Sequence, residues 1–247
     1  MAGTPAATWA QPALLGQTVV VLGGSSGIGL ETARQAREAG ARVIITGRNE
    51  VRLRDAARQV HAEEAVAFDA ADADRLEQFF ADLPGPIDHV MVTAGGPHYL
   101  AMDEMDLAEA RRAFDERLTV TLGVGLYSRG RMRPGGSLVF VGGTGTRRPA
   151  VGLTVAAALP ALVANLALEL APTRVNLVAP GFVDTPLSAT LLGDRFEARR
   201  DSLRSALPIG RLVGPADVAA LAIHMMSNEA LTGATFEIDG GQRILPT

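Results

Sequence analysis

The sequence predicts an α/β fold in which helices cover both faces of a parallel, doubly wound sheet of about seven strands. Short β-branched runs alternate along the chain with longer segments of helical spacing, and strands separated by helices in this way form βαβ units. The runs are apolar throughout, as expected of strands that are buried on both faces. No repeat and no Pro-, Gly- or Ser-rich linker divides the 247 residues, so a single domain is expected.

The elements follow from these patterns in chain order. Residues 1–14 are expected to form an N-terminal tail, and residues 15–247 the domain. Pro160 lacks the backbone N–H that a helix interior needs, so the helix that carries it is expected either to start late or to kink. The expected strands are 18–22, 42–46, 65–68, 89–92, 137–141, 174–178 and 235–238. The expected helices are 28–39, 50–60, 72–83, 107–131 and 159–170.

The composition excludes several classes of function. The 23 basic and 27 acidic residues give a formal net charge of −4 at pH 7, which is not the basic footprint of a nucleic-acid-binding protein. Cysteine is absent, which excludes disulfides and thiolate nucleophiles, and no spacing of other ligands indicates a metal site. Every basic residue is arginine and none is lysine, which excludes Schiff-base chemistry and a phosphate-loop lysine.

No segment predicts export or membrane insertion. The first twelve residues carry no Arg or Lys, unlike the basic start of a signal peptide. The longest apolar stretch, 155–170, is interrupted by Pro160, Asn165 and Glu169 and is shorter than the ~20 residues that span a bilayer. The expected location is therefore the cytoplasm, with no membrane and no nucleic acid among the partners.

A glycine-rich turn joins the first expected strand to the first expected helix. Its glycines let backbone N–H groups approach a pyrophosphate, and the helix N-terminus adds its positive dipole end. Strand, turn and helix together predict a Rossmann-like dinucleotide-binding site, although a tight strand-to-helix turn without a ligand also recruits glycine. The expected cofactor-binding residues of this turn are Gly23, Ser25, Ser26, Gly27, Ile28 and Gly29.

The end of the second strand indicates which dinucleotide is bound. NAD-selective sites carry an acidic residue there, whereas a nearby arginine accommodates the 2′-phosphate of NADP. This chain has Arg48 just past the strand and no acidic residue at its end. NADP(H) is therefore the preferred cofactor and NAD(H) the alternative; Arg48 as an ordinary surface charge is the other interpretation.

With these residues in place, the chain resembles the short-chain dehydrogenase/reductase family over residues 16–243. The spacing of Gly23, Gly27 and Gly29 matches that family's phosphate loop. By resemblance, Asp69 contacts the adenine ring and the loop 180–185 holds the nicotinamide carboxamide. The further matches to the family's motifs are Ala94, Gly95, Pro180, Gly181, Val183, Thr185, Asp239, Gly240 and Gly241.

The family's catalytic Ser-Tyr-Lys-Asn tetrad does not carry over to this chain. Alignment places Gly152 at the tyrosine position, Ala156 at the lysine position and Arg117 near the asparagine position. The fifth strand ends in Val-Gly-Gly-Thr, where the family has its serine. A positioned acid contributes ~10²–10⁴-fold to such reactions, so an active enzyme needs another proton donor.

Five residues are candidate substitutes for the missing tetrad. His98 and Tyr99 follow the fourth strand, and an imidazole with a pKa near ~6.5 is able to donate to a developing alkoxide; as ordinary loop residues they would have no such role. Thr144 and Thr146 offer hydroxyls for a substrate oxygen, although turns commonly carry threonine. Arg117 stabilises an oxyanion or binds an acidic substrate if it points inward, and is a solvated charge if it points outward.

Three functions remain open at this point. The first is an atypical NADP(H)-dependent oxidoreductase that reduces a carbonyl or oxidises an alcohol on a small, mainly apolar substrate, with a non-standard proton donor. The second is a catalytically silent dinucleotide-binding subunit, and the third is a non-redox isomerase or cyclase. The resemblance further implies a substrate lid near residues 185–208 and a homo-oligomer, either a dimer or a tetramer.

Overall fold

The computed structural model describes residues 12–96, 106–144 and 153–245. They form a seven-stranded sheet in which every strand pair is parallel, in the order β3-β2-β1-β4-β5-β6-β7. The predicted fold class, a single-domain Rossmann-like α/β fold, is thereby confirmed. The strands are β1 (Thr18–Leu22), β2 (Arg42–Gly47), β3 (Glu64–Ala67), β4 (Ile87–Val92), β5 (Met132–Val141), β6 (Arg174–Pro180) and β7 (Thr235–Ile238).

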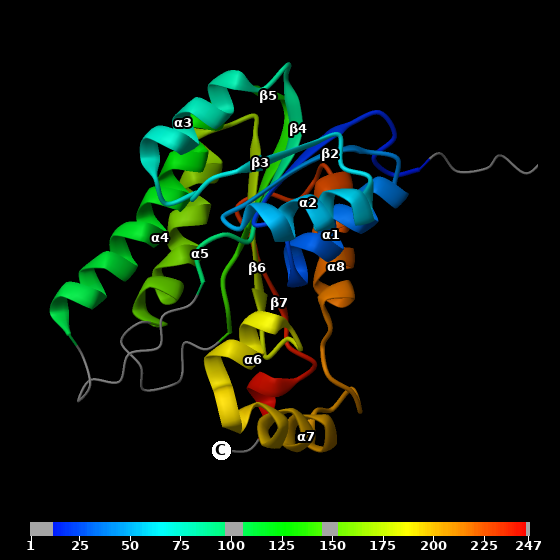
Figure 1. Cartoon of the computed structure of the whole chain (residues 1–247), viewed down its shortest axis with the longest axis vertical. Helices are drawn as coiled ribbons and strands as arrows, with labels where there is room; N and C mark the ends of the chain where they lie inside the picture. The colour runs from blue at the N-terminus through cyan, green and yellow to red at the C-terminus, as the bar shows by residue number, and fades with distance from the viewer. Residues whose placement is uncertain (1–11, 97–105, 145–152, 246–247) are drawn as a thin grey trace, which may run out of the picture.

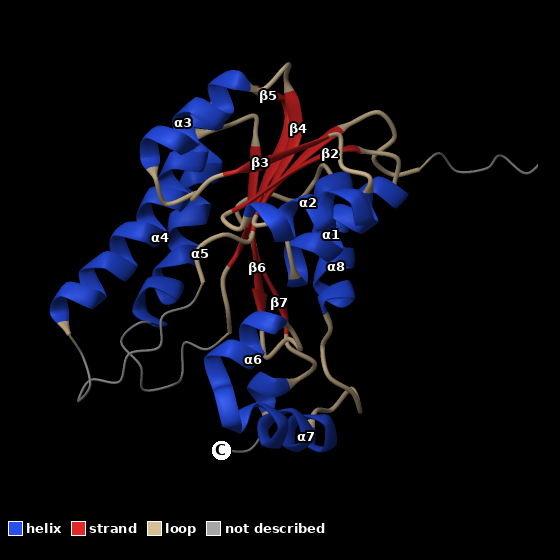
Figure 2. Ribbon diagram, viewed as in Figure 1, coloured by secondary structure: helices blue, strands red, loops and turns tan. Residues whose placement is uncertain are grey.

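Helices cover both faces of this sheet (Figures 1 and 2). Those on one side are α1 (Gly27–Glu38), α2 (Glu50–Val60) and α8 (Pro215–Ser227); those on the other are α3 (Ala73–Asp82), α4 (Leu107–Ser128) and α5 (Leu153–Glu169). Because successive side chains of a strand point to opposite faces, Val19 and Val21 enter the first core layer while Val20 and Leu22 enter the second. All four side chains are fully buried, which explains why the strands have no polar alternation.

The strand order reverses between β1 and β4. The chain moves from β1 outward to β3, then returns to place β4 on the other side of β1. In doubly wound folds, ligands bind beyond the carboxyl ends of the strands at such a reversal. A separate helical segment, α6 (Pro186–Leu192) and α7 (Phe196–Ala206), lies at the end of the molecule beyond β6 and β7 (Figure 1).

Two expected boundaries in the fourth βα unit are wrong. Helix α4 ends at Ser128 and not at residue 131, because Arg129 leaves the helical region with ψ at 126° and Gly130 has a φ of +82°. Strand β5 begins at Met132 and not at 137. Met132 pairs with Ile87, and a register shift follows before the regular pairing resumes; such an irregularity accommodates the proline and glycines that made this segment look like a turn.

The expected start of α5 is also wrong. The helix begins at Leu153 and continues through Pro160 to Glu169, so the proline does not delay its start. Proline inside a helix removes one hydrogen bond and costs roughly 3 kcal/mol. Leu159 and Val163, on either side of the proline, are buried against the sheet, and this apolar burial offsets the cost.

The first described residues pack onto the domain. Leu14 is fully buried, and its backbone nitrogen donates to the carbonyl of Ala39 at 2.9 Å, so the described N-terminal residues already belong to the folded domain.

Among the helices of the described residues, none is both long and apolar enough to cross a bilayer.

Candidate functional site

The glycine-rich turn lies at the carboxyl end of β1, against the end of β4. Gly23 has a φ of +92°, and a Cβ there would stand 2.6 Å from the Thr93 hydroxyl oxygen. A Cβ on Gly29 would stand 2.3 Å from the carbonyl oxygen of Gly23. The Thr93 hydroxyl lies within hydrogen-bond distance of the carbonyls of Leu22 (3.0 Å) and Gly23 (3.1 Å). Only glycine fits at either position, because the bare backbone of the turn packs directly against the end of β4.

Helix α1 starts from this turn with its terminal N–H groups available. Its N-cap residue, Ser26, makes no side-chain capping hydrogen bond, and no acidic side chain stands in the first turn. Uncapped N–H groups and the helix dipole together favour an anion. The bare turn and the open helix N-terminus therefore fit the pyrophosphate of a dinucleotide.

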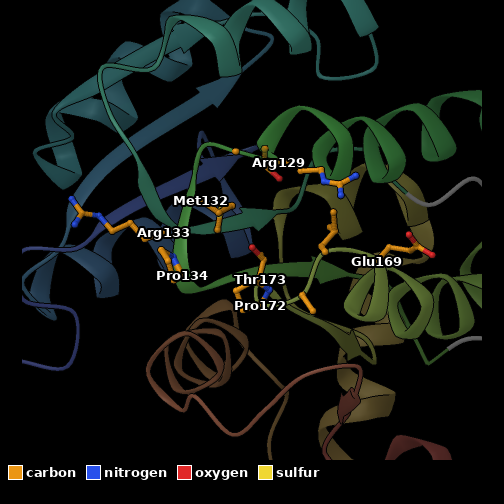
Figure 3. Close-up of a pocket in the computed structure, with 11 residues that line it drawn as sticks. Arg129, Met132, Arg133, Pro134, Glu169, Pro172 and Thr173 are labelled. Atoms are coloured by element: carbon orange, nitrogen blue, oxygen red, sulfur yellow. The ribbon is translucent and has the colours of Figure 1, made fainter.

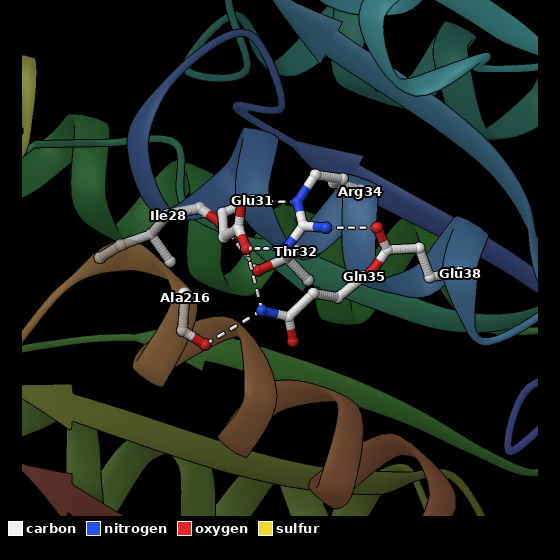
Figure 4. Close-up of polar contacts among 7 residues, drawn as sticks. All are labelled: Ile28, Glu31, Thr32, Arg34, Gln35, Glu38 and Ala216. Carbon is white, nitrogen blue, oxygen red and sulfur yellow. Dashed lines mark hydrogen bonds and ion pairs between the residues drawn. The ribbon is translucent and has the colours of Figure 1, made fainter.

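Polar contacts link neighbouring turns of α1, and one contact joins the helix to α8 (Figure 4). Glu31 accepts from the Arg34 side chain (Nε to Oε2, 2.9 Å) and from Gln35 (3.0 Å). The Arg34 hydrogen bond lowers the pKa of Glu31. Gln35 also donates to the backbone carbonyl of Ala216 on α8 at 3.1 Å. The Gln35 hydrogen bond thus joins α1, which starts at the glycine-rich turn, to α8.

The residues predicted to select the cofactor lie at the next two strand ends. Arg48 follows β2 and Asp69 follows β3, and their charged groups are 3.9 Å apart. Both side chains are largely exposed, at 79% and 53%. Ser25, in contrast, is buried, and its hydroxyl lies 3.0 Å from where a Cβ on Gly47 would stand. Arg48 is free to move toward a phosphate, because a loose, exposed ion pair holds it only weakly.

The loop after β6 meets the glycine-rich turn from the opposite side. A Cβ on Gly27 would lie 3.5 Å from the Thr185 methyl group. Thr185 caps α6 by accepting from the backbone nitrogen of Ser188 at 3.2 Å. Gly181 donates from its backbone nitrogen to Ile238 at 3.1 Å, after Pro180 has ended β6. The two predicted cofactor segments, far apart in the sequence, therefore lie side by side.

The last strand secures this loop. A Cβ on Gly181 would lie 2.7 Å from the Asp239 Cβ. The side-chain oxygen of Gln242 accepts from the backbone nitrogen of Phe182 at 2.8 Å. Val183 is buried and forms an isolated parallel bridge with Val213. Sequence reasoning missed Gln242; its place directly after the Asp-Gly-Gly motif was the signal that could have indicated it.

Arg117 points inward, toward the sheet edge. Its guanidinium donates to the carbonyls of Val141 at the end of β5 and of Gly96 after β4, both at 3.4 Å. The nearest atoms to a Cβ on Gly95 would be those of the Arg117 guanidinium, from 3.8 Å. Burial lowers the pKa of Arg117. The outward, solvated alternative that the sequence left open does not describe this side chain.

Thr144 is the other candidate catalytic residue within the described residues. Its backbone nitrogen donates to the Pro180 carbonyl at 3.0 Å, and its hydroxyl lies 3.5 Å from the same oxygen. Thr144 therefore stands between the ends of β5 and β6. His98, Tyr99 and Thr146 lie outside the described residues, as does Gly152, and the chain position of Ala156 falls within α5.

A surface cavity elsewhere does not belong to this site. It has a volume of about 190 Å³ and lies at the opposite edge of the sheet, between the segment that follows α4 and the segment that follows α5 (Figure 3). Met132, Pro134, Glu169 and Pro172 are among its lining residues. Within residues 12–96, 106–144 and 153–245, no group of three His, Cys, Asp or Glu side chains is placed to hold a metal ion.

Comparison with known proteins decides the family. The family model described as enoyl-(acyl carrier protein) reductase matches residues 23–243. The short-chain dehydrogenase/reductase ATR9 of Stachybotrys chlorohalonatus is 32% identical, over 93% of this chain and 98% of that protein. The chain belongs to the short-chain dehydrogenase/reductase family. The bare glycine turn, the loop 180–185 and the last strand are thus this family member's versions of the motifs on which the resemblance was based.

Three further relatives have names that state an activity or a bound dinucleotide. Cis-4-hydroxycyclohexanecarboxylate dehydrogenase of Sinomonas cyclohexanicum is 34% identical, over 91% of this chain and 96% of that one. The solved structure of the MalC reductase/Diels-Alderase of Malbranchea aurantiaca has a TM-score of 0.86 and 26% identity, covering 95% of this chain and 99% of that one. A small-chain dehydrogenase in complex with NADPH has a TM-score of 0.78 and 28% identity, covering 92% and 98%.

Proposed function

We propose that this short-chain dehydrogenase/reductase is an atypical NADP(H)-dependent enzyme that interconverts a carbonyl and an alcohol on a small, mainly apolar substrate. The observation that carries the proposal is the bare glycine cradle at the end of β1, with Gly23 and Gly29 against Thr93 and Gly27 against Thr185. A Cβ at Gly23 or Gly29 would clash with Thr93 or with the Gly23 carbonyl, so both positions require glycine, as the pyrophosphate-binding turn of a dinucleotide fold does.

The choice of NADP(H) rests on Arg48. No acidic residue ends β2, and Arg48 stands beyond it with an exposed side chain. A guanidinium there is suited to a 2′-phosphate, since paired charge-assisted hydrogen bonds form readily between them. The structural relative in complex with NADPH supports this choice, with NAD(H) as the alternative cofactor.

The chemistry needs a proton as well as a hydride. When bound, the reduced nicotinamide supplies a hydride to the carbonyl carbon. The carbonyl oxygen then takes a proton, for which we propose His98 or Tyr99, with Thr144 or Thr146 holding the oxygen and Arg117 offering a positive charge. No lysine exists in the chain to lower a tyrosine pKa, which is why the proton donor is non-standard.

The segment 185–208 serves in this proposal as a lid over the substrate. Leu187 on α6 reaches the loop after β4, with a side-chain carbon 3.9 Å from where a Cβ on Gly96 would stand. Leu187 and Leu191 expose 49% and 39% of their surface. Leucines of this kind over the carboxyl edge favour an apolar substrate, and lids of this kind exclude water from the reaction.

Non-redox chemistry is the second candidate, and one comparison favours it. The MalC relative is named both a reductase and a Diels-Alderase, so an isomerase or cyclase on the same scaffold is a specific alternative. A catalytically silent dinucleotide-binding subunit is the third. All three candidate functions share the glycine cradle around Gly23, and they differ in the chemistry that takes place next to it.

Assembly and location complete the proposal. Leu118, Leu122 and Leu126 form an exposed stripe on α4, spaced at successive turns of the helix. An exposed apolar stripe of this kind marks a protein contact, and we propose that it pairs two copies of the chain in a dimer or tetramer. We place the protein in the cytoplasm, with small-molecule partners and no nucleic acid or membrane.

A fluorescence titration with NADPH and a panel of carbonyl compounds tests the function. The proposal expects tight NADPH binding and loss of the reduced cofactor's signal with at least one carbonyl. Tight binding without oxidation supports the silent subunit, and product formation without a change in cofactor supports the isomerase or cyclase. For the proton donor, His98→Ala lowers turnover by at least ~10²-fold; unchanged turnover removes His98 from the mechanism.

A further inference from the structure

We infer that Arg117 anchors a carboxylate on the substrate, so the substrate is a small, mainly apolar molecule that carries one negative charge. This inference rests on the function proposed above and adds the chemical class that the site accepts. Its starting point is that the Arg117 guanidinium leaves α4 and reaches the carboxyl edge of the sheet, between the ends of β4 and β5.

The guanidinium has donors to spare. An arginine carries five N–H donors, and within the described residues the side chain of Arg117 makes two hydrogen bonds, both to backbone carbonyls and both at 3.4 Å. Ordinary N–H···O bonds are shorter, at about 2.7–3.2 Å. Both contacts are therefore weak, and no described residue occupies the remaining N–H groups.

Arg174 shows how the same chain treats a buried arginine that is structural. It lies at the other edge of the sheet, at the start of β6, with 5% of its surface exposed. Five backbone carbonyls accept from its guanidinium at distances of 2.7–3.3 Å, those of Gly135, Met225, Met226, Asn228 and Leu231. Arg174 is thus fully satisfied by the protein itself, whereas the described residues satisfy Arg117 only in part.

The charge of Arg117 also lacks a partner among the described residues. Arginines on the other helices, such as Arg34, Arg54 and Arg58, pair with a carboxylate three or four residues away. No described carboxylate lies within 4 Å of the Arg117 guanidinium, and burial lowers the pKa of this residue. A half-buried charge that the described residues leave without a counterion is costly, and binding an anion would remove that cost.

Small residues surround the guanidinium. Glycines stand at the ends of both strands, Gly95 and Gly96 after β4 and Gly142 and Gly143 after β5. At Gly143, the nearest atom to a Cβ among the described residues would be the Pro180 carbonyl oxygen at 3.7 Å, so no described side chain fills the position where the family has its serine. The glycines themselves place no side chain beside the charge.

The same space has apolar walls. A Cβ on Gly142 would meet Leu177 from 3.3 Å and Leu159 at 3.6 Å, and one on Gly96 would meet Leu187 at 3.9 Å. A carboxylate on Arg117 thus lies next to leucines that suit the apolar remainder of a substrate. The planar guanidinium matches a carboxylate in a two-point geometry and keeps its charge at all physiological pH values, which favours an anchor over a proton donor.

Calorimetry with benzoate and benzamide tests the anchor, since the two probes share a shape and differ in charge. The protein saturated with NADP⁺ is expected to bind benzoate at least tenfold more tightly than benzamide. Arg117→Gln loses this preference, and Arg112→Gln, which changes an exposed arginine on the same helix, retains it. Equal binding of the two probes, or a preference that survives in Arg117→Gln, overturns the inference.

A second measurement separates an anchor from a structural arginine. Arg117→Met removes a poorly satisfied charge and keeps an apolar side chain of similar length, so we expect its Tm to equal or exceed that of the wild type. A Tm lower by several degrees would mean that Arg117 holds β4 and β5 together, and would overturn the inference. The benzoate and benzamide titrations are repeated without dinucleotide, to separate this inference from the proposed function. If the protein prefers benzoate but binds no dinucleotide, the role of Arg117 as a carboxylate anchor stands and the proposed oxidoreductase function is rejected.

Discussion

The imidazole of His89 hydrogen-bonds the hydroxyl of Ser137 inside the sheet, across the β4–β5 pair, at 2.8 Å. The other ring nitrogen lies 2.6 Å from the Gln17 side-chain oxygen. That oxygen is an acceptor, so the ring donates to Gln17 and accepts from Ser137. Burial, and to a smaller degree the charge of Arg174, lowers the pKa of His89 to about 3. The folded protein therefore holds this histidine neutral.

This neutral histidine makes the free energy of unfolding depend on pH. The unfolded chain binds a proton at His89 near pH ~6.5, whereas the folded protein does so only near pH 3. The neutral ring therefore makes its full contribution to the free energy of unfolding above pH ~6.5. This contribution falls as the pH is lowered from ~6.5 toward 3, by at most ~1.4 kcal/mol per pH unit. Urea denaturation at pH 7, 6 and 5 measures the slope. We expect His89→Gln to flatten it and His61→Gln, at an exposed helix end, to leave it unchanged; an unaltered slope in His89→Gln would contradict the assignment.

Replacement of Arg48 is expected to change cofactor preference. Arg48→Asp removes the proposed partner of the 2′-phosphate and adds a repelling charge, so NADPH affinity falls at least ~10-fold while NADH affinity changes little or rises. Fluorescence titration with both reduced dinucleotides measures the two constants. Arg52→Asp, which alters an exposed arginine of α2, serves as the control. If Arg48→Asp weakens NADPH and NADH equally, Arg48 is not the selector.

Gly23→Ala is expected to abolish dinucleotide binding. The added Cβ would stand 2.6 Å from the Thr93 hydroxyl and 2.9 Å from the backbone nitrogen of Ala94, at a φ of +92°. Gly130→Ala is the matched control, because Gly130 also has a positive φ (+82°) but no heavy atom within 4 Å of the new Cβ. Gly130→Ala costs only the backbone strain, roughly 1–2 kcal/mol. Thermal denaturation should therefore show a larger loss for Gly23→Ala, and NADPH titration should show loss of binding in that variant alone; retained NADPH affinity would reject the cradle.

The leucine stripe on α4 gives a prediction about assembly. Leu122, with 46% of its surface exposed, lies at the centre of the stripe, so Leu122→Arg places a charge in the proposed contact between copies and lowers the oligomeric mass. Light scattering after gel filtration measures that mass. Val51→Arg, on the exposed surface of α2, should leave it unchanged. A wild-type protein that is already monomeric at micromolar concentration would contradict the prediction.

The fold could be predicted because its strands carry a strong local signal. Their β-branched residues are buried on both faces, so the hydrophobic runs mark the strands with little ambiguity. The role of the glycines at 23 and 29 could also be predicted from a local signal. A strand, a tight turn and a helix in that order leave few interpretations of such glycines other than a dinucleotide-binding turn. Strand β5 before residue 137 was missed because Pro134, Gly135 and Gly136 are residues that normally terminate a strand.

The direction of Arg117 could not be predicted from the sequence. Helix α4 is apolar on both sides: Val120 and Val124 are buried against the sheet, while Leu118 and Leu122 are exposed. With no clear polar face, the periodicity does not reveal which side of the helix meets the sheet. The contacts of Arg174 could not be predicted either. Its partners are carbonyls from β5 and from the end of α8, which only the tertiary structure brings together.

The bridge between Val183 and Val213 joins the two ends of the segment that carries α6 and α7. Insertions, deletions or exchanges within residues 189–206 leave Thr185 beside Gly27 and Pro208 beside Gly241, so we expect the strands and the glycine-rich turn to tolerate them. With the proposed role of this segment as a substrate lid, exchanging it as one contiguous piece is expected to change the substrate range and to keep dinucleotide binding.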